Sequence, residues 1–212
     1  MAKVKMSKKA ASIDMTAMCD VAFLLLTFFI LTATAKQPEP LPVQTPASTN
    51  QTKLPETGLI TITVGNANGE QKVFLGMKDR DIREKTLELM GNMHGVKFTK
   101  EETEKFRLID EFGVPIGGLK QVIGMTSTER NKAGVQPGVP LDSLNNELKD
   151  WIYTARQANA DLHPNGKELA FAIKGDAKQQ YPQIHKIMDI LQDQKINNFN
   201  LVTGLRAKPK VN

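Results

Sequence analysis

The chain has few of the residues that form disulfide bonds or aromatic clusters in many proteins. Its 212 residues include one cysteine, one tryptophan and two tyrosines. A single cysteine, Cys19, cannot form an intramolecular disulfide bond, so packing and hydrogen bonds must hold the fold together. This cysteine usage is compatible with an oxidising compartment.

Strong charge of one sign is also missing. The net charge is +5, and lysines are scattered among acidic residues without basic and aromatic side chains gathering on one face. Nucleic-acid binding needs such a face, so we expect no nucleic-acid partner.

The pattern of an enzyme is absent as well. His94, His163 and His185 are far apart in the sequence and form no H-x-x-x-H pair, which argues against a metal site. The glycine-rich segment 113–118 lacks the Lys-Ser/Thr of a phosphate-binding loop. Cys19 has no nearby histidine that could activate it. We therefore expect no catalytic residue, no metal and no cofactor.

One long hydrophobic run stands out against this background. It extends from Val21 to Leu31, and with its flanks, 15–35, it has the roughly 20 residues that a spanning helix needs. Asp20 opens the run. A charged group on such a helix costs a few kcal/mol on insertion scales, so an intramembrane aspartate indicates a functional site. We predict that Asp20 carries protons.

Hydroxyl groups lie on the same helical face as Asp20. At about 100° per residue, Thr16, Asp20, Thr27 and Thr34 fall within roughly 40° of one another. This polar stripe can share protons or water with the carboxylate. The alternative is that the threonine hydroxyls bond back to carbonyls of their own helix and that Asp20 merely sits at the membrane interface.

The N-terminal segment has some features of a cleavable signal peptide. Lysines precede the apolar run and Ala33-Thr34-Ala35 follows it. However, Asp20 lies where a signal core should begin, and Cys19 precedes the run, whereas a lipoprotein cysteine follows it. We therefore expect a retained anchor. The short arm carries lysines at positions 3, 5, 8 and 9, which places the N-terminus in the cytoplasm and the rest outside it.

Beyond the anchor the chain is long enough for one domain. We predict a two-layer α/β fold with helices on a mixed sheet. Strands are expected at 59–64, 72–75, 169–173 and 199–203, and helices from Asp142 to the turn at Asn165-Gly166 and from Pro182 onward. The expected regions are a cytoplasmic arm (1–12), a transmembrane helix (13–35), a Pro-rich periplasmic linker (36–57), a periplasmic domain (58–205) and a tail (206–212).

Two of these regions carry further expectations. The linker has five prolines and no hydrophobic period, so we expect a semi-rigid extended spacer, and the alternative is a flexible spacer of no consequence. The segment 79–139 is expected to be an insertion that forms a partly ordered lobe at the sheet edge. Residues 81–90 and 99–106 are helix-compatible, the second stretch opening with a possible capping box at residues 99–102, and the span 112–140 should be mostly loop with a short helix. Deletion of 79–139 should leave the core folded.

Two motifs resemble a known family. The segment 13–21, I-D-M-T-A-M-C-D-V, is similar to the start of the membrane helix in the ExbD/TolR family of biopolymer-transport proteins, which reads roughly I-N-x-T-P-x-x-D-V. Asp14 stands where asparagine is usual and Ala17 where proline is usual. The second match is the closing strand–helix–strand, with Ile173-Lys174-Gly175-Asp176, Tyr181, Met188-Asp189 and Leu201-Val202-Thr203. We therefore regard Asp176, Tyr181 and Asp189 as motif residues of the soluble domain.

This resemblance implies an inner-membrane motor subunit driven by the proton-motive force. Two copies of the helix would lie inside a ring of a multi-span ExbB/TolQ-like partner, in the lipid bilayer, and Asp20 would carry the protons. The periplasmic domains would pass the motion to a TonB-like protein. The resemblance also implies that a short extended segment around Leu41-Pro42 or Leu54-Pro55 adds a strand to the partner subunit. The alternative from the residues alone is a membrane-anchored periplasmic binding or scaffold module without proton coupling.

Overall fold

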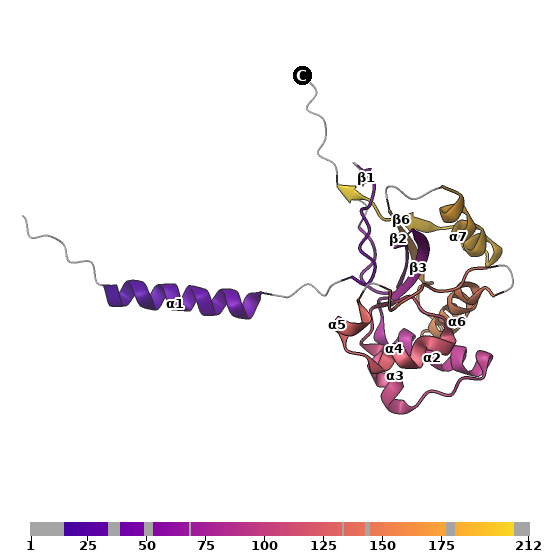
Figure 1. Ribbon diagram of the computed structural model, residues 1–212, viewed down its shortest axis with the longest axis horizontal. Helices are drawn as coiled ribbons and strands as arrows, with labels where there is room; N and C mark the ends of the chain where they lie inside the picture. Colours follow the sequence, from indigo (N-terminus) through magenta and orange to yellow (C-terminus); the bar gives the residue numbers. More distant parts are fainter. Residues whose placement is uncertain are drawn as a thin grey trace, which may run out of the picture. The chain divides into compact units, whose positions relative to one another are not determined.

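The computed structural model describes residues 15–33, 39–48, 53–67, 69–132, 134–142, 145–176 and 181–205. The chain separates into two compact units, residues 1–38 and residues 39–212. Each unit is described by itself below, and Figure 1 labels the elements.

The described part of the first unit is one helix, α1 (Met15–Thr32). It has 18 residues, which at about 1.5 Å per residue gives roughly 27 Å, close to the thickness of a bilayer core. Its length and composition fit a membrane span. The expected transmembrane helix is therefore confirmed as an apolar helix, although residues 13, 14, 34 and 35 lie outside the described residues.

The second unit is built on a five-stranded mixed sheet in the order β4-β3-β2-β5-β6. The strands are β2 (Leu59–Ala67), β3 (Glu70–Met77), β4 (Glu111–Phe112), β5 (Ala170–Gly175) and β6 (Phe199–Leu201). The pairs β2–β3 and β3–β4 are antiparallel, and β2–β5 and β5–β6 are parallel. The predicted mixed sheet, the first hairpin and the central position of β5 are confirmed.

A second, smaller sheet pairs β1 (Ala47–Ser48) with β7 (Gly204–Leu205) in parallel. The linker thus forms a short strand at Ala47–Ser48 and not at Leu41-Pro42 or Leu54-Pro55, and this strand pairs with the end of its own chain. Pairing with a partner subunit stays a prediction.

Six helices complete the unit. They are α2 (Arg80–His94), α3 (Lys100–Arg107), α4 (Ile116–Gly124), α5 (Ser127–Arg130), α6 (Glu147–Leu162) and α7 (Tyr181–Asp193). Thr99 and Glu102 form the expected capping box of α3. The prediction that α6 begins at Asp142 is wrong, because Asn146 accepts a hydrogen bond from the Lys149 amide and fixes the start at Glu147.

The core lies where one face of the sheet meets the helices. Strand alternation places Ile60, Ile62 and Val64 of β2 in the same buried cluster as Trp151 of α6 and Phe106 of α3. The rings of Phe106 and Phe112 approach to 5.3 Å, and Phe112 and Trp151 approach to 4.9 Å between centroids. Such aromatic pairs add about 0.5–1.5 kcal/mol each beyond the area that they bury.

The expectation of a separable lobe at 79–139 is wrong. This segment forms α2 to α5 and β4, and Figure 1 shows α2, α3, α4 and α6 gathered beside one another. Its apolar side chains belong to the same buried cluster as the sheet, among them Ile82, Leu87, Met90, Phe106, Phe112 and Leu119. From 112 to 140 the glycines and prolines predicted mostly loop, whereas burial of side chains such as Phe112 and Leu119 accompanies a strand, β4, and a helix, α4.

A buried arginine joins this segment to itself and to the sheet. Arg83 of α2 donates to the carbonyls of Lys78, Arg107 and Ile109 and pairs with the Asp110 carboxylate at 2.9 Å. Burial lowers the pKa of Arg83, and Asp110 counteracts that shift. The guanidinium thus ties Lys78, just before α2, to the end of α3 and to the residues just before edge strand β4.

Candidate functional site

The first candidate site is Asp20 in the second turn of α1. It is the only acidic or basic residue in that helix. No residue of α1 is buried, and Val21, Leu24 and Phe28 are all more than half exposed. Its apolar side chains are thus exposed along the helix, whose length and composition fit a membrane span.

The structure describes the threonines of the polar stripe to different extents. Thr27 Oγ1 donates to the Leu24 carbonyl at 2.9 Å, so its hydroxyl proton is bound by its own backbone, as the alternative interpretation expected. The oxygen keeps its acceptor capacity. Thr16 lies in the first turn of α1, and Thr34 lies outside the described residues. The direction in which the stripe faces stays a prediction.

The motif residues of the soluble unit are spread along one connection. Asp176 follows β5, and its amide donates to the Val64 carbonyl at 3.1 Å. Tyr181 is the first residue of α7. The Asp189 carboxylate lies 2.8 Å from His185 Nδ1 on the same helix. These residues thus lie after β5 and in α7, and their functional importance stays a prediction.

The second candidate site is the surface on which the linker is docked. Leu41 is only 4% exposed, and it packs with Val43 over Gly65 of β2. A Cβ atom at Gly65 would lie 2.6 Å from Val43 Cγ1 and 3.0 Å from Leu41 Cδ2. Glu39 completes the attachment with an ion pair to Lys174 of β5, at 2.5 Å between Oε2 and Nζ. Residues 39–43, which we call the strap, are therefore packed against the sheet and are not a free spacer.

Sequence analysis missed the strap because a proline-rich segment has no hydrophobic period. The one available signal was Gly65, a glycine inside a β-branched strand, which often marks a close approach of another backbone. The pair of Glu39 and Lys174 carried no signal, since the two residues lie 135 positions apart.

A buried acid lies near this ion pair. The Oε1 atom of Glu111 in β4 is shielded from solvent. Burial raises the pKa of Glu111, while the interaction with the Thr63 hydroxyl and the positive charge of Lys174 oppose that shift and the negative charges of Glu39 and Asp110 add to it.

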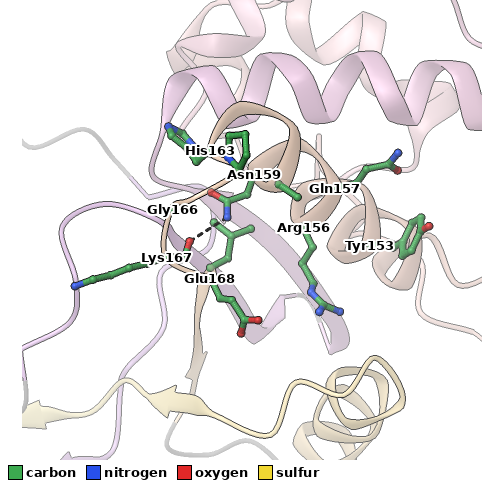
Figure 2. Close-up of a pocket in the computed structure, with 11 residues that line it drawn as sticks. Tyr153, Arg156, Gln157, Asn159, His163, Gly166, Lys167 and Glu168 are labelled. Atoms are coloured by element: carbon green, nitrogen blue, oxygen red, sulfur yellow. Dashed lines mark hydrogen bonds between the residues drawn. The ribbon is translucent and has the colours of Figure 1, made fainter.

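A separate cavity of about 540 Å³ lies at the C-terminal end of α6. Figure 2 shows Asn159 reaching from this end toward the loop that carries Lys167 and Glu168, while Arg156 extends from the helix in another direction. Asn159 Nδ2 donates to the Lys167 carbonyl at 3.1 Å, and Arg156 donates to the Gln194 carbonyl at 2.8 Å. Both groups thus hold the loops in place.

The histidines take the helix-end and surface positions that the sequence suggested. His94 is in the last turn of α2 and lies 3.1 Å from Asp150, and His163 is the C-cap residue of α6. Among the described residues no three His, Cys, Asp or Glu side chains are grouped in a way that could hold a metal ion.

Comparison with known families identifies a relationship over almost the whole chain. The family model described as biopolymer transport protein ExbD/TolR matches residues 6–205. The match includes α1, the strap and the segment 79–139, which the two sequence motifs had left unexplained. Neither a search of curated proteins nor a search of solved structures found a significant match.

Proposed function

Because the chain belongs to the ExbD/TolR family of biopolymer transport proteins, we propose that it is a proton-driven motor subunit of the inner membrane. The family acts in energy transduction for biopolymer transport and is not a family of enzymes. In this proposal α1 spans the membrane once, with the lysine-rich arm in the cytoplasm and the α/β unit in the periplasm.

The observation that carries the proposal is the isolated carboxylate of Asp20 on an uncovered apolar helix. A carboxyl group is neutral in apolar surroundings and ionised beside water or polar partners. An aspartate that moves between these two settings takes up a proton in one and releases it in the other. Thr27 and Thr16 offer acceptor oxygens on the same face of the helix for that transfer.

The partners follow from the family and from the exposed helix. We propose that two copies of α1 lie inside an ExbB/TolQ-like multi-span protein, which supplies the missing cover, and that the periplasmic units act on a TonB-like protein. Such a ring would bury the exposed apolar side chains of α1, among them Phe23 and Leu24, by packing against them.

The docked strap gives a route from the helix to the sheet. While Glu39 and Leu41 are seated, only residues 33–38 connect α1 to the periplasmic unit. Such a tether spans at most about 25 Å, whereas the full linker of about 22 residues reaches roughly 60–70 Å. We propose that motion of α1 pulls on the strap and changes how it is seated.

The test is the substitution Asp20→Asn in cells, with Asp20→Glu as the matched control. Asparagine keeps the shape and hydrogen bonding of aspartate but carries no titratable proton, whereas glutamate keeps the carboxyl group. We expect the Asn variant to lose energy-dependent transport at normal expression and complex assembly, and the Glu variant to keep part of it. Normal transport in the Asn variant would instead favour the anchored binding module.

A further inference from the structure

A second cavity lies between the strap and the segment 79–139. It has a volume of about 300 Å³, is partly open to solvent, and is lined by Leu41, Pro42, Lys72, Phe74, Arg130 and Lys132 among others. One wall is therefore part of the linker, and another comes from the loop that follows α5. The cavity exists in this form only while the strap is seated.

The base of the cavity contains a buried ammonium group. Lys72 of β3 is only 6% exposed, and its Nζ donates one hydrogen bond, to the Gln136 carbonyl at 3.3 Å. Among the described residues no carboxylate forms an ion pair with it. An ammonium group has three donors, and a buried charge is stable only when it is paired and hydrogen-bonded. Lys72 thus has donors to offer to an anion.

The loop around Lys72 is held rigidly. The buried Gln136 side chain accepts from the Gly113 amide at 2.7 Å and donates to the Arg130 carbonyl at 3.1 Å. Arg130 and Lys132 add two more positive charges to the lining. Burial lowers the pKa of Arg130, an effect that the nearby Asp110 opposes, and arginine stays charged at every physiological pH.

The negative charges around the cavity are already committed. Glu39 lines it too, but its carboxylate is paired with Lys174, and Asp110 is paired with Arg83. The positive charges of Lys72, Arg130 and Lys132 therefore outnumber the carboxylates of the lining that are not already paired. The remaining wall is apolar, from Leu41, Pro42 and Phe74, and an inorganic phosphate has no apolar part with which to cover it.

We propose that this cavity binds an acidic peptide through one aspartate or glutamate side chain, with the carboxylate between Lys72 and Arg130 and its hydrocarbon stem against Leu41 and Phe74. The planar guanidinium fork of arginine suits a carboxylate, and lysine adds a point charge. Because the strap forms one wall, the peptide binds the docked state better than the undocked state and thereby stabilises docking.

The test uses the full-length chain in detergent and isothermal titration calorimetry with the peptide acetyl-Ala-Ala-Glu-Ala-Ala-amide. The matched glutamine peptide and inorganic phosphate are titrated in parallel. We expect saturable binding of the glutamate peptide, at least about tenfold weaker binding of the glutamine peptide, and weaker binding of phosphate. Absence of saturable binding, or tighter binding of phosphate, overturns the proposal.

Variants separate the site from general effects. Lys72→Met and Arg130→Gln should each weaken binding of the glutamate peptide at least about tenfold, whereas the exposed Lys97→Met should leave it unchanged. Leu41→Ser, which removes a buried apolar contact of the strap, should weaken binding as well. Circular dichroism melting checks that each variant is folded. Equal binding by folded wild type, Lys72→Met and Arg130→Gln contradicts the assignment.

The proposal is independent of the proton role of Asp20. The variant Asp20→Asn should bind the glutamate peptide with wild-type affinity whether or not it transports. Failure of the motor proposal and failure of the peptide site therefore give different results.

Discussion

Glu39 of the strap and Lys174 of strand β5 form an ion pair of 2.5 Å across 135 positions of the chain. The Lys174 side chain is 19% exposed and that of Glu39 is 35% exposed. The pair attaches the segment that follows the membrane helix to a central strand of the sheet. Any change in this attachment alters the length of chain between α1 and the sheet.

We expect Glu39→Gln to loosen the strap without unfolding the sheet. The free energy that holds the strap against the sheet should fall by about 1 kcal/mol or less, because the ion pair is partly solvated. Hydrogen–deuterium exchange of residues 39–48 should accelerate, while exchange in β2 and β5 stays slow. Glu88→Gln, which breaks the exposed pair of Lys85 and Glu88, is the control and should leave exchange in the strap unchanged. Unchanged exchange in Glu39→Gln would contradict the role of the pair.

Gly65→Val should unseat the strap by steric conflict. The added Cβ would lie 2.6 Å from Val43 Cγ1, a distance that real Cβ atoms do not adopt, and tightly at 3.0 Å from Leu41 Cδ2, whereas valine itself suits a strand. We expect faster proteolysis within 39–48 and a nearly unchanged circular dichroism spectrum. Gly117→Ala, at a position with nothing within 4 Å, is the matched control. A strap as protected in Gly65→Val as in wild type would refute the close packing.

Glu111→Gln should stabilise the protein at neutral pH. Burial raises the pKa of Glu111 in the folded state above that in the unfolded chain, so the ionised form opposes folding. That penalty is relieved as the pH falls through the folded-state pKa and is absent below the ordinary value of about 4.3. The advantage of the Gln variant, measured by urea denaturation between pH 8 and 4, should therefore shrink toward acid. A pH-independent difference would rule out this titration.

Phe106→Ala should lower the free energy of unfolding of the second unit, residues 39–212, by about 3–5 kcal/mol. The substitution removes a fully buried ring beside Phe112 and Trp151. Leu108→Ala, two residues away and 66% exposed, is the control and should cost about 0.5 kcal/mol or less. Chemical denaturation of both variants measures the difference. If Phe106→Ala were as stable as the control, residues 79–139 would be separable from the core after all.

The polar stripe of α1 should face a neighbouring subunit and not lipid. In a Cys19→Ser background, cysteine at position 27 should cross-link between subunits in membranes more readily than cysteine at Leu25 or Phe29, which lie about 140–180° from Asp20. A cross-linking maximum at Leu25 and Phe29 would show that the opposite face of α1 meets the neighbouring subunit and would contradict the prediction.

The sequence alone determined the elements whose pattern is local. The apolar run gave α1, alternating β-branched residues gave β2, and Thr99 with Glu102 gave the start of α3, because periodicity and capping are written in neighbouring residues. The Asp20 site was found in the same way, since one carboxylate in an apolar helix needs no tertiary information to be noticed.

Only the tertiary structure decided the rest. The position of Leu41 over Gly65, the pair of Glu39 and Lys174, and the cavity around Lys72 join segments that are far apart in the chain, so no local pattern encodes them. Phe106 and Phe112 belong to the core because α6 and the sheet close over them, and no local pattern within 79–139 shows that contact. Burial of apolar surface between distant segments overrides weak local preferences, and this is why the strap and the segment 79–139 were misjudged from sequence.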